Sequence, residues 1–175
     1  MEENKKSSTQ AAMLYGLILG IVVILFSLVM FLLDVDRESP VNYLAYLLMI
    51  IVLYLAMVNF RDQQLGGIAS YGQMFGLGFK TVLFGTIISA IFTYIFVTVI
   101  DPGMIDEILL TTEEKMMENE NMTDEQIDQT LLFTERFVAN PIAITIWAAG
   151  FNLIAGTVLS LIISIFVKRE DGSPA

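Results

Sequence analysis

The side chains that could do chemistry in this sequence are of few types. Its 175 residues include neither cysteine nor histidine. A thiolate metal site, a disulfide and a lipidated thiol are therefore excluded, as is the imidazole that usually serves as proton shuttle or transition-metal ligand. Catalysis would have to use Asp, Glu, Lys, Ser or Tyr, and these occur in no grouping of recognisable spacing. We therefore predict a non-enzymatic protein without catalytic, cofactor-binding or metal-binding residues.

Two motif classes that hold ligands in loops are also missing from the sequence. The glycine-rich stretch at residues 66–78 contains no GxxxxGK[ST] or GxGxxG nucleotide-binding pattern. The acidic stretch at residues 101–140 lacks the alternating Asp or Asn followed by Gly of a calcium loop. The net charge of −10 argues against a nucleic-acid partner, since such binding depends on basic contacts to phosphates.

The elements that would position any site are apolar runs suited to a lipid bilayer. The chain is 55% hydrophobic with a mean hydropathy of +0.70, more apolar than a soluble domain of this size. About 20 apolar residues in a helix cross about 30 Å of hydrocarbon. We expect the first run to be a retained span, because it is too long for a signal peptide and lacks a cleavage site. The charge-free runs of this length are residues 11–33, 41–60, 81–100 and 141–167.

The predicted fold is an all-α integral membrane four-helix bundle whose solvent is partly the bilayer. Residues 1–10 form a cytoplasmic tail, and residues 11–100 hold the first three spans with a glycine-rich cytoplasmic-side connector at 61–80. Residues 101–140 form an acidic extracytoplasmic helical hairpin. Residues 141–167 form the fourth span, and residues 168–175 form a second cytoplasmic tail.

Basic residues set the expected orientation, because they accumulate in cytoplasmic segments. If the N-terminus is inside, six bases lie on the inner side and three on the outer side. We therefore predict that both termini are cytoplasmic. The inner bases are Lys5, Lys6, Arg61, Lys80, Lys168 and Arg169, and the outer bases are Arg37, Lys115 and Arg136.

Small and polar side chains recur at every fourth position in three of the spans, which keeps them on one helix face. In lipid such faces usually contact another helix, because small side chains let two backbones approach closely. We favour packing within one bundle over the alternative of a homo-oligomer or membrane-protein seam. The candidate helix-packing residues are Gly16, Gly20, Gly85, Ser89, Thr93, Asn152, Gly156 and Ser160.

Asn152 is the most polar side chain near the middle of a span. An unpaired amide in hydrocarbon costs on the order of several kcal/mol. We therefore expect Asn152 to hydrogen-bond Ser89 or Thr93 on the third span. A substrate contact is the alternative.

Residues 101–140 contain eleven acids and two bases, a net charge of −9. They are expected to form two helices: Asp101 and Pro102 are typical of a helix start, and Thr123 with Gln126 has the spacing of a capping box. The acidic face is either simply solvated or a contact for a cation or basic partner. Methionines that could give adaptable apolar contacts are Met104, Met116, Met117 and Met122.

The connector at residues 61–80 could be a flexible tether, a substrate site or a packed corner. Gly66 and Gly67 suit a turn after the second span. Irregular backbone at membrane depth must be buried or line a water cavity, so we predict a packed corner. A short interfacial helix leading into the third span is indicated by the helical spacing of Leu65, Ile68, Phe75 and Phe79.

The stretch GGIASYGQMFGLGF in this connector resembles the bacterial domain-of-unknown-function family numbered 4199. The order of the spans, with a long outer helical segment before the last one, fits that family over nearly the whole chain. The resemblance implies a multi-span protein of the bacterial inner membrane and brings no catalytic residues with it. The residues that carry the likeness are Gly66, Gly67, Ile68, Ser70, Tyr71, Gly72, Gln73, Phe75, Gly78 and Phe79.

Three functions remain open, in this order of preference. The first is a non-enzymatic protein that assembles with itself or with a membrane-protein partner. The contacts would be the helix faces that carry the small and polar side chains, together with the acidic segment. The second is a small transporter or channel subunit, although no charge lies at the centre of a span and the two halves show no convincing repeat. The third is a membrane-embedded enzyme.

Overall fold

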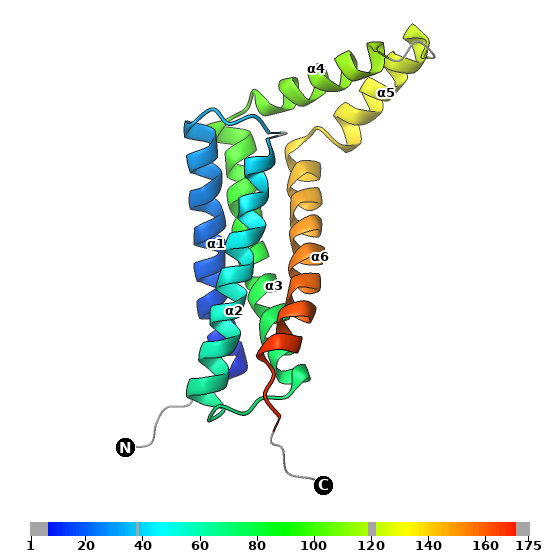
Figure 1. Ribbon diagram of the computed structural model, residues 1–175. Coiled ribbons are helices and arrows are strands. Elements are labelled where there is room, and N and C mark those ends of the chain that lie inside the picture. Colours follow the sequence, from blue (N-terminus) through cyan, green and yellow to red (C-terminus); the bar gives the residue numbers. More distant parts are fainter. Residues whose placement is uncertain (1–6, 38, 119–121, 171–175) are drawn as a thin grey trace. The chain divides into compact units, whose positions relative to one another are not determined.

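The computed structural model describes residues 7–37, 39–118 and 122–170 (Figure 1). Over these residues the chain is helical and has no strand, which confirms the predicted all-α class. η1 is a short 3-10 helix and η2 is a π-helical turn. The elements are α1 (Ser8–Leu32), η1 (Pro40–Tyr43), α2 (Leu44–Gln64), α3 (Tyr71–Ile95), η2 (Phe96–Ile100), α4 (Met104–Met117), α5 (Asp124–Phe137) and α6 (Pro141–Val167).

Four helical segments are long and apolar enough to cross a membrane. A helix of 25 residues such as α1 rises about 37 Å, which exceeds the hydrocarbon thickness. Apolar side chains point outward as well as inward: Leu32 and Phe166 are each 78% exposed. Such exposure is favourable in lipid, and the chain is therefore a multi-pass membrane protein. The four segments are Ser8–Leu32, Pro40–Gln64, Tyr71–Ile100 and Pro141–Val167.

Polar residues define where the first and last spans begin. The Ser7 hydroxyl accepts a hydrogen bond from the Gln10 amide at 3.2 Å, and the Gln10 side chain accepts one from the Ser7 amide at 3.0 Å. Asn140 accepts a hydrogen bond from the Ala143 amide at 2.9 Å, with Pro141 in the first helical position of α6. These caps satisfy amide groups that have no partner inside the helix.

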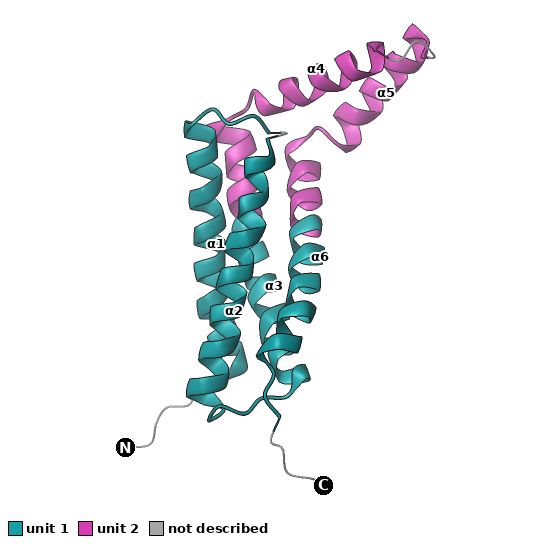
Figure 2. Cartoon of the chain, in the orientation of Figure 1, with its two compact units in different colours: residues 1–89, 151–175 teal, residues 90–150 magenta. Residues whose placement is uncertain are grey.

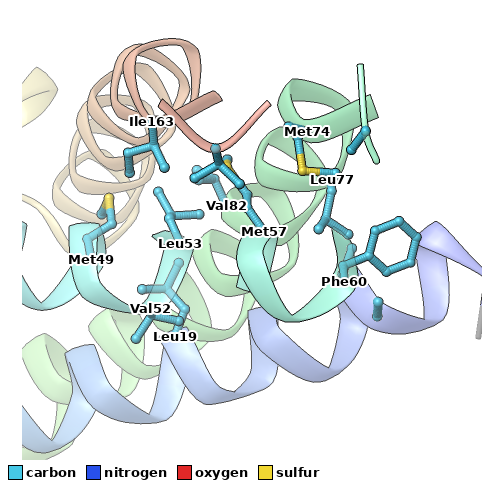
Figure 3. Packing of buried hydrophobic residues seen from close by; sticks show 14 residues of the cluster. Leu19, Met49, Val52, Leu53, Met57, Phe60, Met74, Leu77, Val82 and Ile163 are labelled. Carbon is cyan, nitrogen blue, oxygen red and sulfur yellow. The ribbon is translucent and has the colours of Figure 1, made fainter. Parts of the chain in front are cut away.

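The chain divides into two compact units, residues 1–89 with 151–175 and residues 90–150 (Figure 2). In the first unit, α1, α2 and parts of α3 and α6 enclose the core, where Leu53, Met57 and Val82 lie together fully buried (Figure 3). Unbranched methionine fills irregular gaps between such helices. At one end of this unit α1 and α3 begin while α2 and α6 end (Figure 1), so the glycine-rich connector and the end of α6 meet there.

The third span begins earlier than its charge-free run suggested. Instead of a short interfacial helix followed by a span at residues 81–100, one continuous helix, α3, starts at Tyr71. Only residues 65–70 of the predicted 61–80 connector are non-helical. The reason is burial: Met74 and Leu77 are fully buried in the core, so this helical turn belongs to the bundle although Lys80 follows it.

The second unit contains the end of α3, η2, α4, α5 and the start of α6. The predicted capping box begins α5: Thr123 accepts from the Gln126 amide at 3.4 Å, and the Gln126 side chain accepts from the Thr123 amide at 3.0 Å. The helix α4 starts at Met104 and not at Pro102, because Asp101 begins a turn in which its carbonyl accepts from the Met104 amide at 3.2 Å. Helices α4 and α5 contact each other.

Candidate functional site

The turn after α2 depends on two glycines. Gly66 and Gly67 have φ of 70° and 89°, a left-handed conformation that L side chains adopt only at a cost of about 1–2 kcal/mol. A Cβ added at either position would meet nothing within 4 Å. These glycines are therefore required by the backbone conformation and not by close packing.

The connector is tied to the end of α6 by a reciprocal backbone pair. The Ala69 amide donates to the Arg169 carbonyl at 2.8 Å, and the Arg169 amide donates to the Ala69 carbonyl at 2.9 Å. Ala69 is 1% exposed, and the adjoining Val167 is equally buried. Two segments that are far apart in the sequence thus form an isolated antiparallel bridge, which a flexible tether would not do.

Arg61 strengthens this junction from α2. Its Nη1 donates to the Val167 carbonyl oxygen at 2.8 Å, and its Nε donates to the Asp62 carboxylate at 2.7 Å. Val167 is the last residue of α6, where carbonyl groups lack helical partners and carry partial negative charge. The guanidinium therefore caps α6, and Asp62 holds it in place. We refer to Arg61, Asp62, Ala69, Val167 and Arg169 as the α6 clasp.

Helix α3 begins after this turn, with residues that carry the resemblance to the family. The Ser70 hydroxyl accepts from the Gln73 amide at 3.3 Å, and the Gln73 side chain accepts from the Ser70 amide at 2.9 Å. The Tyr71 hydroxyl donates to the Leu161 carbonyl at 3.4 Å, and its ring stacks on Phe75 with centroids 6.4 Å apart. The connector is thus a packed corner. A third capping box went unpredicted here, although its Ser-x-x-Gln spacing is visible in the sequence.

Three of the candidate packing residues bring α1 and α3 into close contact. A Cβ added at Gly16 would lie 2.5 Å from Phe84 Cβ, and one added at Gly20 would lie 2.7 Å from Ile88 Cγ2. From the other side, a Cβ at Gly85 would lie 3.0 Å from Leu19 Cδ2. Real Cβ contacts are rarely this short, so the absence of side chains at these positions lets the two helices approach.

The small residues on one face of α6 pack in the same way inside the first unit. A Cβ added at Gly156 would lie 2.5 Å from Val82 Cγ1, and one added at Gly78 would meet Ser160 Oγ at 2.8 Å and also Met57. Ser160 is fully buried. The stripes on α1, α3 and α6 therefore contact neighbours within the chain. Thr93, in the second unit, is half-buried.

Asn152 was predicted to pair with Ser89 or Thr93 on the third span. The Ser89 hydroxyl donates to the Thr86 carbonyl of its own helix at 3.1 Å. Asn152 is half-buried and lines a recess of about 390 Å³, whose polar lining also includes Arg37, Ser39 and Asn42. The recess thus includes residues of the α1–α2 loop, and pairing of Asn152 with Ser89 or Thr93 stays a prediction.

In the second unit, α4 and α5 form a groove of about 610 Å³ that sequence reasoning did not identify. Four leucines and four carboxylates line it. Leu110 and Leu132 are 59% and 66% exposed, and both line this groove between the carboxylates. The lining residues are Asp106, Leu109, Leu110 and Glu113 on α4, and Asp128, Leu131, Leu132 and Glu135 on α5.

Comparison with known proteins agrees with the resemblance carried by the corner residues. No curated protein and no solved structure matches the chain. One family model matches residues 14–169, a range that includes the corner, all four spans apart from the first residues of α1, and the acidic helices. The chain therefore belongs to the family described as proteins of unknown function, DUF4199.

Proposed function

We propose that this protein is a non-enzymatic component of the bacterial inner membrane that binds a partner through helices α4 and α5. The observation that supports this most directly is the groove between these helices, where exposed leucines lie beside carboxylates. Exposed apolar side chains that share one surface are typical of a contact site. The membrane spans then serve to hold that surface at the bilayer.

The proposal includes an orientation. Four crossings put both termini on one side of the membrane and residues 101–140 on the other. Six of the nine basic residues lie on the side of the termini, which favours a cytoplasmic location for that side. The contact surface on α4 and α5 then faces the extracytoplasmic space.

Self-association through the small-residue stripes has less support. Gly16 lies against Phe84, Gly85 against Leu19, and Gly156 against Val82. These faces are already covered within one chain, so a second copy cannot use them unless the bundle opens.

A transporter is the second candidate, and the recess at Asn152 favours it. The recess combines amide, hydroxyl and guanidinium groups with apolar walls from Val23, Phe26 and Met49, as a site for a polar or amphiphilic solute would. Solute or ion flux from purified protein in liposomes that is abolished by Asn152→Leu would favour this function over partner binding.

Site-specific photocrosslinking in native membranes tests the primary proposal. A photoreactive amino acid at Leu132 is expected to give a discrete protein adduct, because this side chain lines the groove. The matched control is the same group at Glu114, which is exposed on α4 but does not line the groove. Lipid adducts alone at Leu132, or identical adducts at both positions, would contradict the proposal.

A further inference from the structure

The helices α4 and α5 carry the same sequence pattern. Residues 105–113 read IDEILLTTE and residues 127–135 read IDQTLLFTE. Six of the nine positions are identical: Ile, Asp, the two Leu, Thr and Glu. Each helix also contains four acids and one base, a net charge of −3. The two helices are therefore copies of one amphipathic unit.

The structure uses the two copies equivalently. Asp106, Leu109, Leu110 and Glu113 line the groove from α4, and their counterparts in the repeat line it from α5. The second leucine of each pair, Leu110 or Leu132, is more than half exposed in both copies. The repeat thus maps onto one shared surface, the groove, and not onto two separate faces.

The short connection makes α4 and α5 an antiparallel pair, so the Asp of one copy lies at the same end of the groove as the Glu of the other. In each helix the two acids are seven positions apart, a rise of about 10 Å, with the leucine pair between them. Each end of the groove therefore carries two carboxylates and its middle is apolar. Among the described residues, none of these four carboxylates forms an ion pair.

This pattern decides between possible occupants. A second copy of the hairpin would bring like charges together, and an anionic bilayer surface would repel the same carboxylates. A helix fits if it has basic residues seven positions apart and apolar residues at the third and fourth positions between them, because all four then lie on one face. Amphipathic helices are commonly bound in apolar grooves through residues with this spacing.

Resting on the proposed partner-binding function, we propose that α4 and α5 form a duplicated half-site for a basic amphipathic helix of pattern Lys/Arg-x-x-apolar-apolar-x-x-Lys/Arg. One basic residue pairs with the carboxylates at each end of the groove, and the apolar pair covers Leu110 and Leu132. Because the two half-sites are equivalent, the occupant binds in either direction.

The test uses the full chain in phosphatidylcholine nanodiscs and a fluorescent alanine–glutamine helix carrying Lys-x-x-Leu-Leu-x-x-Lys. The control peptide has the same composition, with the second lysine moved two positions so that it leaves the face. Fluorescence anisotropy is expected to show binding of the first peptide about tenfold tighter, a difference of about 1.4 kcal/mol. Equal affinity of the two peptides overturns the proposal.

Matched variants separate the effect of the groove carboxylates on peptide binding from the effect of net charge. The quadruple variant Asp106→Asn, Glu113→Gln, Asp128→Asn and Glu135→Gln is expected to lose the preference between the peptides. Replacing Glu107, Glu114, Glu118 and Glu125 by Gln removes the same charge outside the groove and is expected to keep it. Equal loss in both variants, with helicity retained by circular dichroism, shows nonspecific charge attraction and overturns the proposal.

A charge-neutral variant and a membrane control complete the design. Leu110→Gln with Leu132→Gln leaves every carboxylate in place and is expected to weaken binding of the first peptide about tenfold, since the apolar contact is lost. A fluorophore at Leu110→Cys that nitroxide lipids quench before peptide is added would show that the bilayer covers the groove, which also overturns the proposal.

The outcomes distinguish this inference from the proposed function. A protein adduct at Leu132 in native membranes, together with equal affinity for the two peptides, leaves partner binding standing and removes the duplicated half-site. Preferential binding of the first peptide without a native adduct supports the half-site and contradicts partner binding in the cell.

Discussion

Replacing Gly156 by alanine tests the close approach of α6 and α3. The new Cβ would lie 2.5 and 2.7 Å from the two γ-methyl carbons of Val82, whereas carbon atoms in contact normally lie about 3.5–4.0 Å apart. One of the helices must therefore shift by about 1 Å. Val82 is 1% exposed, and a β-branched side chain in a helix has essentially one χ1 rotamer, so it cannot turn away.

The magnitude follows from two opposing effects. Overpacking of a core by one methyl group costs about 1–3 kcal/mol, while alanine in place of glycine in a helix stabilises by about 1 kcal/mol. We expect Gly156→Ala to lower the free energy of unfolding by up to about 2 kcal/mol. The control is Gly150→Ala on the same helix, where the added Cβ meets nothing within 4 Å, and which should be neutral or stabilising.

The assay is unfolding in mixed micelles, followed by fluorescence of the sole tryptophan, Trp147. Adding Val82→Ala to Gly156→Ala should recover part of the loss, because removal of the γ-methyl groups relieves the overlap. The resulting double-mutant cycle should give a coupling of about 1–2 kcal/mol. If Gly156→Ala is as well tolerated as Gly150→Ala, the close contact of α3 and α6 at Val82 is refuted.

Three further predictions concern the corner and the topology. Gly67→Ala should destabilise the protein by about 1 kcal/mol in the same assay because its φ is positive. Arg61→Met should destabilise it more than Asp62→Asn, since only the former leaves the Val167 carbonyl without its guanidinium donor; equal effects would contradict the capping role. In this cysteine-free chain, Thr111→Cys should react with an impermeant maleimide added outside the inner membrane, whereas Glu170→Cys should react only after permeabilisation.

Much of the fold could be predicted because lipid imposes strong constraints on sequence. A span needs a long charge-free run, and a helix start needs an acceptor for free amide groups, so the cap at Thr123 was predicted correctly. The same reasoning placed Gly16 and Gly156 on packing faces, because four-residue spacing of small residues has one simple structural cause.

The features that were not predicted depend on tertiary contacts, or on a repeat between two segments, and neither is visible in a local sequence pattern. The start of α3 at Tyr71 depends on burial of Met74 and Leu77, and charge-free length alone cannot show burial. The groove between α4 and α5, in contrast, has a signal in the sequence, the repeated pattern Ile-Asp-x-x-Leu-Leu-x-Thr-Glu. This repeat lies within residues 101–140, so a comparison of the first half of the chain with the second half does not reveal it.

The α6 clasp has a consequence for biosynthesis. Arg61 and the Val167 carbonyl that it caps are separated by 106 positions along the chain. At about 5–20 residues per second, the ribosome needs roughly 5–20 s to make the second after the first. Late in that interval the first three spans have been made but α6, whose Ser164 contacts Met57, has not. The nascent protein then exposes to lipid or to an insertion factor a surface that α6 later buries.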